Sequence, residues 1–133
     1  MVINTETKLI GLIGFPLVQS HSPIMQNAAF SRCGLNKIYI PLEAEPANLE
    51  QAVKGISKMN FDGFNITKPY KIEIMKYLDE VDEYARLIGA VNTVKISNGI
   101  LKGYNTDGTG FLRSFRENAG VEIEGKAAEL QGQ

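Results

Sequence analysis

The chain alternates short apolar runs with segments of helical spacing, and this alternation constrains its fold more than any other feature. Residues 8–14 (K-L-I-G-L-I-G) form an apolar run closed by a Phe-Pro pair, which is typical of a buried strand. Ser22 is a good N-cap, and Pro23 suits the first position of a helix that Gly34 ends. The beginning of the chain therefore predicts a strand followed by a helix.

The same alternation continues along the chain. Residues 37–43 are rich in β-formers, and Pro41 suits the end of a strand or an edge strand. Apolar residues at helical spacing predict a helix over residues 46–58, and residues 61–66 predict a third strand. Two short helices are expected after it, at 71–78 and 82–88.

A β-hairpin is predicted after these elements, because residues 91–96 and 100–104 flank a Ser-Asn-Gly turn. Strands that alternate with helices favour a parallel sheet, and a hairpin adds antiparallel pairing to it. We therefore expect an α/β fold, a three-layer sandwich with a mixed, mainly parallel sheet flanked by helices.

Thr106 or Asp107 is expected to cap a final helix that ends at Gly120. Residues 121–133 are polar and resemble a linker or tail more than a core element. A chain of 133 residues buries roughly two-thirds of its unfolded surface, enough for one core. The sequence thus predicts one domain over residues 1–120 and a tail over residues 121–133.

Charge and composition exclude several classes of protein. Fourteen Lys and Arg against fifteen Asp and Glu give a net charge of −1, so nucleic acid is not an expected partner. Cys33 and His21 are the only residues of their types, so no disulfide and no metal site are expected. The apolar run at residues 9–18 is too short to span a membrane and lacks a basic leader, so we expect a cytoplasmic protein.

Polar side chains gather just after three of the predicted strands, at residues 19–22, 65–71 and 105–107. Open α/β sheets bind ligands at the carboxyl ends of their strands, so these three loops are expected to meet at one crevice. Each loop also has an ordinary structural interpretation as a helix cap, a turn or a solvated lysine. The lone His21 has no evident partner and is a weak candidate for a catalytic base.

Four segments in a fixed order give a more specific indication. They are Gln19-Ser20-His21-Ser22-Pro23, Asn65-Ile66-Thr67-Lys68-Pro69-Tyr70-Lys71, Gly89-Ala90-Val91-Asn92-Thr93 and Tyr104-Asn105-Thr106-Asp107-Gly108. Together they closely resemble the substrate-binding domain of shikimate dehydrogenases, over about residues 8–120. The N-x-T-x-P-x-K and N-T-D-G segments are the most specific of them.

This resemblance implies a function and a set of site residues. Members of the family interconvert 3-dehydroshikimate and shikimate with NADPH, on the route to chorismate and the aromatic amino acids. Residues 1–120 would then form a shikimate-binding catalytic domain. The resemblance assigns the substrate carboxylate to Ser20 and Ser22, the ring hydroxyls to Asn65, Thr67, Asn92 and Asp107, and the catalytic pair to Lys71 and Asp107.

The chemistry of the reaction explains these residue types. Asn, Thr and Asp satisfy several hydroxyls in fixed directions with few rotatable bonds. Hydride transfer leaves the substrate oxygen to exchange a proton with another group, which Lys71 supplies if burial holds its amine against that oxygen. Asp107 would orient the amine but would also favour its charged form, and these two effects oppose each other.

The sequence departs from the family pattern in four places. Gln19 and Gln26 stand where the family has or often has His, and Lys68 stands where an apolar residue is usual. The family continues into a Rossmann domain that binds NADP, whereas this sequence stops at Gln133 without a glycine-rich fingerprint. We therefore expect a truncated substrate half of an NADP-dependent enzyme, inactive by itself.

Two alternatives stay open at this point. The first is a fragment of a quinate/shikimate dehydrogenase, for which NAD is the alternative cofactor. The second is a non-catalytic module that binds a ligand or associates with itself, for example as a homodimer. Shikimate or 3-dehydroshikimate is the expected small-molecule partner if the chain is the substrate half of a shikimate dehydrogenase.

Overall fold

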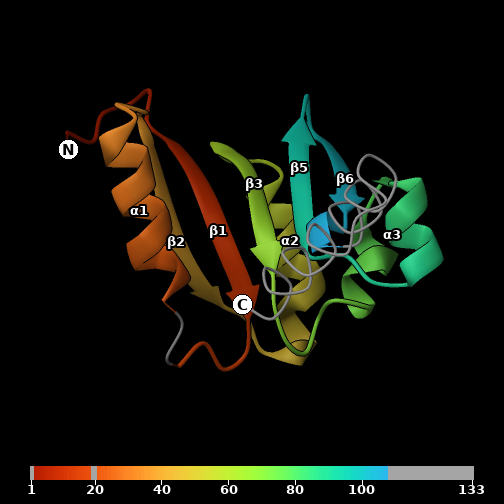
Figure 1. Cartoon of the computed structure of the whole chain (residues 1–133). Helices are drawn as coiled ribbons and strands as arrows, with labels where there is room; N and C mark the ends of the chain where they lie inside the picture. The colour runs from red at the N-terminus through yellow and green to blue at the C-terminus, as the bar shows by residue number, and fades with distance from the viewer. Residues whose placement is uncertain (1, 19–20, 108–133) are drawn as a thin grey trace, which may run out of the picture.

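The computed structural model describes residues 2–18 and 21–107 of the chain. Figure 1 shows that these residues form one sheet with helices packed around it. The elements, in chain order, are β1 (Lys8–Gly14), α1 (Ser22–Arg32), β2 (Lys37–Glu43), η1 (Pro46–Asn48), α2 (Leu49–Ile56), β3 (Phe61–Ile66), η2 (Glu73–Tyr77), β4 (Glu80–Val81), α3 (Glu83–Ile88), β5 (Thr93–Ser97) and β6 (Ile100–Tyr104).

The six strands lie in the order β2-β1-β3-β5-β6-β4. Strand β1 pairs in parallel with β2 and β3, and β4 pairs in parallel with β6, whereas β5 is antiparallel to both β3 and β6. The crossovers through α1 and α2 run in opposite directions across the sheet, so right-handed connections place these helices on opposite faces. The predicted α/β fold with a mixed, mainly parallel sheet is confirmed.

One face of the sheet, which we name the core face, carries the hydrophobic core. Phe64 lies opposite Val94, and Ile13 lies opposite Ile66, and all four side chains are buried. Helix α2, behind the sheet in Figure 1, adds the buried residues Leu49, Val53 and Ile56 at helical spacing. Burial of apolar surface on this face is the main source of the stability of the fold.

The opposite face, which we name the polar face, carries Tyr39, Asn65 and Thr93. Helix α1 lies against β2 on this side, yet none of its residues is fully buried. Instead the Asn27 carboxamide bonds the backbone of Tyr39 twice: Asn27 Nδ2 donates to the Tyr39 carbonyl at 2.8 Å, and the Tyr39 N–H donates to Asn27 Oδ1 at 2.8 Å. Two hydrogen bonds therefore fix α1 on β2.

The predicted hairpin is confirmed. Ser97 pairs with Ile100, which leaves Asn98 and Gly99 as a two-residue connection between β5 and β6. Asn98 has φ 51° and Gly99 has φ 77°. Both values lie in the left-handed region that a type I′ turn requires, which explains the Asn-Gly pair.

The helical boundaries differ from the sequence predictions. Residues 46–58 divide into the short 3₁₀ segment η1 and the helix α2, and the segment expected as a helix at 71–78 forms the 3₁₀ segment η2. Backbone bonds hold both ends of that segment, from the Val91 N–H to the Lys71 carbonyl and from the Asp79 N–H to the Leu101 carbonyl. A 3₁₀ helix rises about 2.0 Å per residue against about 1.5 Å for an α-helix, so it spans a longer distance between two such anchors with the same number of residues.

Three further points concern the ends of elements. Ser22 is the first residue of α1 rather than its N-cap, which is His21 without a side-chain capping bond. The two-residue strand β4 is too short to leave a sequence pattern. The expected final helix to residue 120 and the tail at 121–133 lie outside the described residues.

Candidate functional site

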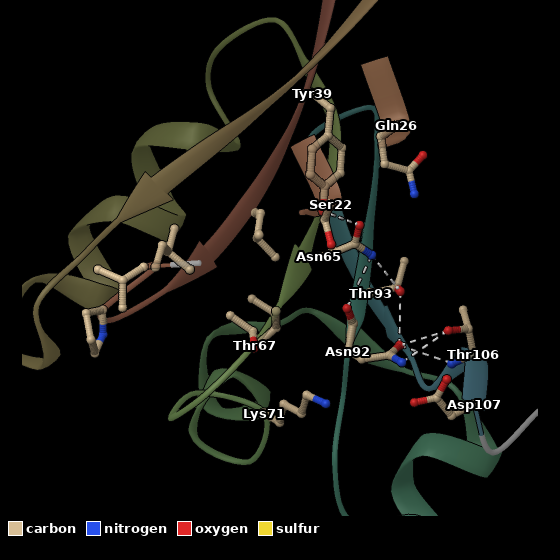
Figure 2. Close-up of a pocket in the computed structure, with 15 residues that line it drawn as sticks. Ser22, Gln26, Tyr39, Asn65, Thr67, Lys71, Asn92, Thr93, Thr106 and Asp107 are labelled. Carbon is tan, nitrogen blue, oxygen red and sulfur yellow. Dashed lines mark hydrogen bonds between the residues drawn. The ribbon is translucent and has the colours of Figure 1, made fainter. Parts of the chain in front are cut away.

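A cleft of about 440 Å³ opens where β1, β3 and β6 end. Because these three strands run in the same direction, the loops that follow them meet at one edge of the sheet. Figure 2 shows the cleft with its fifteen lining residues. They are Leu12, Pro16, Leu17, Val18, Ser22, Gln26, Tyr39, Asn65, Ile66, Thr67, Lys71, Asn92, Thr93, Thr106 and Asp107.

Six of the seven residues that the sequence nominated line this cleft. Those six are Ser22, Asn65, Thr67, Lys71, Asn92 and Asp107. Lys71 and Asp107 are thirty-six positions apart in the sequence, yet their side chains point toward one another in Figure 2. Ser20 lies outside the described residues.

Backbone hydrogen bonds join the loops that follow β1 and β3. The Thr67 N–H donates to the Ile13 carbonyl at 2.9 Å, and the Phe15 N–H donates to the Lys68 carbonyl at 3.1 Å. Gly14 permits this approach, because a Cβ at Gly14 would collide with the Thr67 side-chain methyl. Thr67 is thereby held at the floor of the cleft.

Lys71 reaches the cleft from a turn that a buried tyrosine anchors. The Tyr70 N–H closes the turn on the Thr67 carbonyl at 3.1 Å, and the Tyr70 hydroxyl bonds the Ala44 carbonyl. Burial, with the nearby carboxylates of Glu73 and Glu45, raises the pKa of Tyr70, so its hydroxyl stays protonated as a donor. The Lys71 side chain itself is exposed, so the burial invoked for its amine is not supplied by the described residues.

A chain of hydrogen bonds crosses the polar face along the cleft. The Tyr39 hydroxyl donates to Asn65 Oδ1 at 2.9 Å, and Asn65 Nδ2 donates to Thr93 Oγ1 at 3.0 Å. The Thr93 hydroxyl donates to Asn92 Oδ1 at 3.0 Å, which also accepts from the Thr106 N–H at 3.1 Å. Dashed lines in Figure 2 follow this chain, which holds both asparagines in fixed orientations.

Sequence reasoning assigned no binding role to Tyr39, Thr93 or Thr106, although all three line the cleft. Thr93 and Thr106 belong to the quoted motifs, so their positions beside Asn92 and Asp107 were a usable signal. Tyr39 lies in a strand of β-forming residues far from any of the motifs, and nothing in its local sequence marks it. Burial raises the pKa of Tyr39 to about 12, so its hydroxyl remains a donor at neutral pH.

Two of the positions that depart from the family pattern can be placed. Gln26 lines the cleft one helical turn after Ser22. Lys68 is exposed and is not among the lining residues, which agrees with a lysine that points to solvent.

The donors and acceptors of the cleft define what it can bind. Lys71 contributes a cation, Asp107 a carboxylate, and the asparagines and threonines contribute neutral donors and acceptors. The described residues contain no cluster of three or more His, Cys, Asp or Glu that could hold a metal ion. The donors and acceptors of the cleft therefore suit a small, polar, hydroxylated organic ligand. Separately, no helix among the described residues combines the length and apolar character needed to cross a membrane.

Comparisons with known proteins agree with this description. The family model of the shikimate dehydrogenase substrate binding domain matches residues 12–94, which include the end of β1, all of β3 and the start of β5. The NADP(+) shikimate dehydrogenase of Methanocaldococcus jannaschii is 53% identical over 119 residues, which cover 90% of this chain and 42% of the relative. The chain thus spans less than half the length of that relative.

Two solved structures share the fold. The shikimate 5-dehydrogenase of Listeria monocytogenes, in complex with shikimate and NAD, matches with a TM-score of 0.79 and 44% identity, over 88% of this chain and 40% of that one. The 5-ketofructose reductase of Gluconobacter sp. strain CHM43 matches with a TM-score of 0.78 and 38% identity, over 86% and 42% of the two chains. With the family model matching well over half of its residues, this chain belongs to the shikimate dehydrogenase substrate binding domain family.

Proposed function

We propose that the cleft binds shikimate and 3-dehydroshikimate, as the substrate half of an NADP-dependent shikimate dehydrogenase. One observation carries this proposal: six residues with the chemistry that such a ligand requires come from four separate segments and line one cleft. The solved relative from Listeria monocytogenes supports it, because that protein holds shikimate.

Ser22 is proposed to bind the substrate carboxylate, together with Ser20. Ser22 is the first residue of α1, where the positive end of the helix dipole favours an anion. A hydroxyl at this point adds a donor to those of the backbone. The carboxylate is then held without the burial of a second full charge.

Asn65, Thr67, Asn92 and Asp107 are proposed to bond the ring hydroxyls of the substrate. The two asparagines are held in fixed orientations by the hydrogen-bond chain, and Thr67 is fixed by its backbone. Because these groups are preorganised, binding does not have to spend free energy on ordering them.

Lys71 is proposed to exchange the proton with the substrate oxygen that changes between carbonyl and hydroxyl. Reduction of a ketone leaves an alkoxide oxygen that needs a proton, and an ammonium group can supply it. Asp107, whose carboxylate faces Lys71 in Figure 2, is proposed to orient that ammonium and to bond the adjacent hydroxyl. Lys71 is the group that touches the reacting oxygen in this scheme.

The relatives are named as NADP(+) enzymes, but the described residues do not fit that cofactor. A dinucleotide fold holds the pyrophosphate on a glycine-rich turn between its first strand and helix. Here the connection from β1 to α1 contains Pro16 and no glycine after Gly14. We therefore propose that the described residues bind the substrate and not the dinucleotide.

Calorimetric titration of the chain with shikimate tests the proposal directly. Saturable binding to one site is expected, with a loss of at least about tenfold in affinity for Lys71→Ala. Lys68→Ala is the matched control, because Lys68 is an exposed lysine on the same loop outside the cleft lining, and it should bind as the wild type does. No binding by the wild-type chain, or equal losses in the two variants, would contradict the proposal.

A second candidate ligand follows from the match to 5-ketofructose reductase. 5-Ketofructose is a small polyol that lacks a carboxylate, so it cannot use the carboxylate site proposed at Ser22. Parallel titrations with shikimate, quinate and 5-ketofructose distinguish the candidates. We expect shikimate to bind most tightly, and Ser22→Ala to weaken the two acids without affecting 5-ketofructose.

We further propose that residues 1–120 form the shikimate-binding catalytic domain and that residues 121–133 form a linker or tail. We also propose that the protein acts in the cytoplasm as a homodimer. The near-zero net charge supports the absence of a nucleic-acid partner. Size-exclusion chromatography with light scattering tests the homodimer, since a monomeric mass at micromolar concentration would contradict it.

A further inference from the structure

Tyr39 occupies an unusual place for a cleft residue. It lies in the edge strand β2, and its hydroxyl passes over β1 to reach Asn65 in β3, with 2.9 Å between the two oxygens. Only 3% of Tyr39 is exposed, although its hydroxyl end lines the cleft. The phenol is therefore almost completely buried, and its hydroxyl contacts Asn65.

The direction of the hydrogen-bond chain explains why Tyr39 must donate. The Thr106 N–H is a fixed donor, so the Asn92 atom that it contacts is the oxygen Oδ1. The Thr93 hydroxyl donates to that same oxygen and so accepts from Asn65 Nδ2.

Asn65 Nδ2 also donates to the backbone carbonyl of Asn92, at 3.4 Å. Both acceptors thus lie on the amide nitrogen side of Asn65. Asn65 Oδ1 is consequently turned toward Tyr39, whose hydroxyl is the donor that completes the chain. The orientation of the Asn65 carboxamide is set from both of its ends.

The backbone of Tyr39 holds a second part of the cleft. Its N–H and its carbonyl bond the Asn27 carboxamide, which fixes α1 and with it Ser22. One residue thus links the helix proposed to bind the carboxylate with the asparagine proposed to bind a ring hydroxyl.

We propose that Tyr39 is a positioning residue of this cleft, whose hydroxyl orients the Asn65 carboxamide for a ring hydroxyl of the ligand. This inference rests on the proposed function and adds to it a residue that does not itself touch the substrate. Without the phenol hydroxyl, Asn65 Oδ1 loses its partner, and the carboxamide can rotate away from the orientation that binding needs.

The first experiment compares Tyr39→Phe with Thr7→Val in calorimetric titrations of the chain with shikimate. Each variant removes a buried hydroxyl that donates to an asparagine Oδ1, but Thr7 and its partner Asn36 lie outside the cleft lining. Tyr39→Phe should weaken binding by about tenfold, the effect of losing one oriented hydrogen bond, and Thr7→Val by less than twofold. Equal losses in both variants would indicate a merely structural role and overturn the inference.

The second experiment tests whether Tyr39 acts through Asn65. Asn65→Ala should weaken binding by itself, and Tyr39→Phe added to it should cause no further loss. Fully additive losses would overturn the inference.

A ligand-free measurement separates this inference from the proposed function. In Tyr39→Phe, the NMR signals of the Asn65 side-chain NH₂ group should shift, while in Thr7→Val they should remain as in the wild type. Failure of the wild-type chain to bind shikimate would remove the proposed function, and shifted Asn65 signals would still support positioning by Tyr39. Unchanged Asn65 signals in Tyr39→Phe would overturn the inference even if shikimate binds.

Discussion

The two faces of the sheet differ in the interactions that their side chains make. Phe64 and Asn65 are neighbours in β3 and point to opposite faces: Phe64 is 1% exposed in the core, whereas Asn65 lies in the cleft. On the core face apolar burial stabilises the fold, and on the polar face hydrogen bonds orient side chains. Residues of the core and residues that line the cleft thus alternate along the same strand, as the period of a β-strand requires.

The helices repeat this difference. Helix α2 buries Leu49, Val53 and Ile56 against the core face, whereas α1 has no fully buried residue on the polar face. Asn27 joins α1 to the backbone of Tyr39 in place of burial. A helix fixed by a few directional contacts has a precise position without a large contribution to the core.

The largest effect is expected from Phe64→Ala. Loss of this buried ring should lower the free energy of unfolding by about 3–5 kcal/mol, because it removes apolar burial and leaves a cavity. Chemical denaturation followed by circular dichroism measures the change. A loss below about 1 kcal/mol would show that the core face does not dominate stability.

Asn27→Ala tests the polar attachment of α1. The expected loss in unfolding free energy is about 2 kcal/mol, since two hydrogen bonds are removed and the Tyr39 backbone groups lose their partner. Shikimate affinity should also fall, because Ser22 lies on the same helix. Gln51→Ala, at an exposed position of α2, is the control and should change neither quantity by much.

Ser22→Ala should separate recognition from stability. We expect an affinity for shikimate about tenfold lower, which corresponds to roughly 1.4 kcal/mol of binding free energy. The free energy of unfolding should change by less than about 0.5 kcal/mol, because no residue of α1 is fully buried. A large loss of stability with unchanged affinity would reverse the roles assigned to this residue.

Alkaline pH should act on the polar face through Tyr39. Burial raises its pKa from 10.0 to about 12, so between these values the unfolded chain releases a proton that the folded chain keeps. The free energy of unfolding should therefore fall as pH rises from 10 to 12, and it should fall less steeply in Tyr39→Phe. Denaturation curves of both proteins at pH 9, 10, 11 and 12 measure the difference, and parallel curves would contradict it.

The smallest effect is expected from Asp62→Asn, which removes the ion pair between Lys37 and Asp62 at the start of the sheet. Both side chains are more than one-third exposed and the N–O distance is 3.4 Å, so the pair should contribute less than about 1 kcal/mol. Denaturation at low and high salt should show that the difference from the wild type disappears at high salt. A larger, salt-independent loss would contradict this surface role.

The strands were predictable because each is a short run with its own local pattern. The strands predicted at 8–14, 37–43, 61–66 and 100–104 have those same bounds in the structure. The Asn-Gly pair marked the hairpin, since only a turn with two positive φ angles favours it. The helical segment after β3 was not predictable in its 3₁₀ form, because tertiary backbone bonds at both ends determine it.

The candidate site was predictable from the order of four motifs, and those motifs supplied the six nominated residues that line the cleft. Tyr39 could not be found in this way. Its hydroxyl reaches a residue twenty-six positions away over an intervening strand, and a local sequence pattern carries no trace of such a contact. Its contact with Asn65 follows only from the three-dimensional arrangement of β2, β1 and β3.

The bonds from Asn27 to β2 have a consequence for association between chains. Strand β2 is an edge of the sheet, and the backbone groups of Tyr39 that face away from β1 are already occupied by the Asn27 carboxamide. Pro41, two residues further along the same side, has no N–H to offer. A foreign strand approaching this edge meets backbone groups that are already bonded and a position without an N–H. The attachment of the helix that carries Ser22 therefore also protects this edge of the sheet from pairing with another chain.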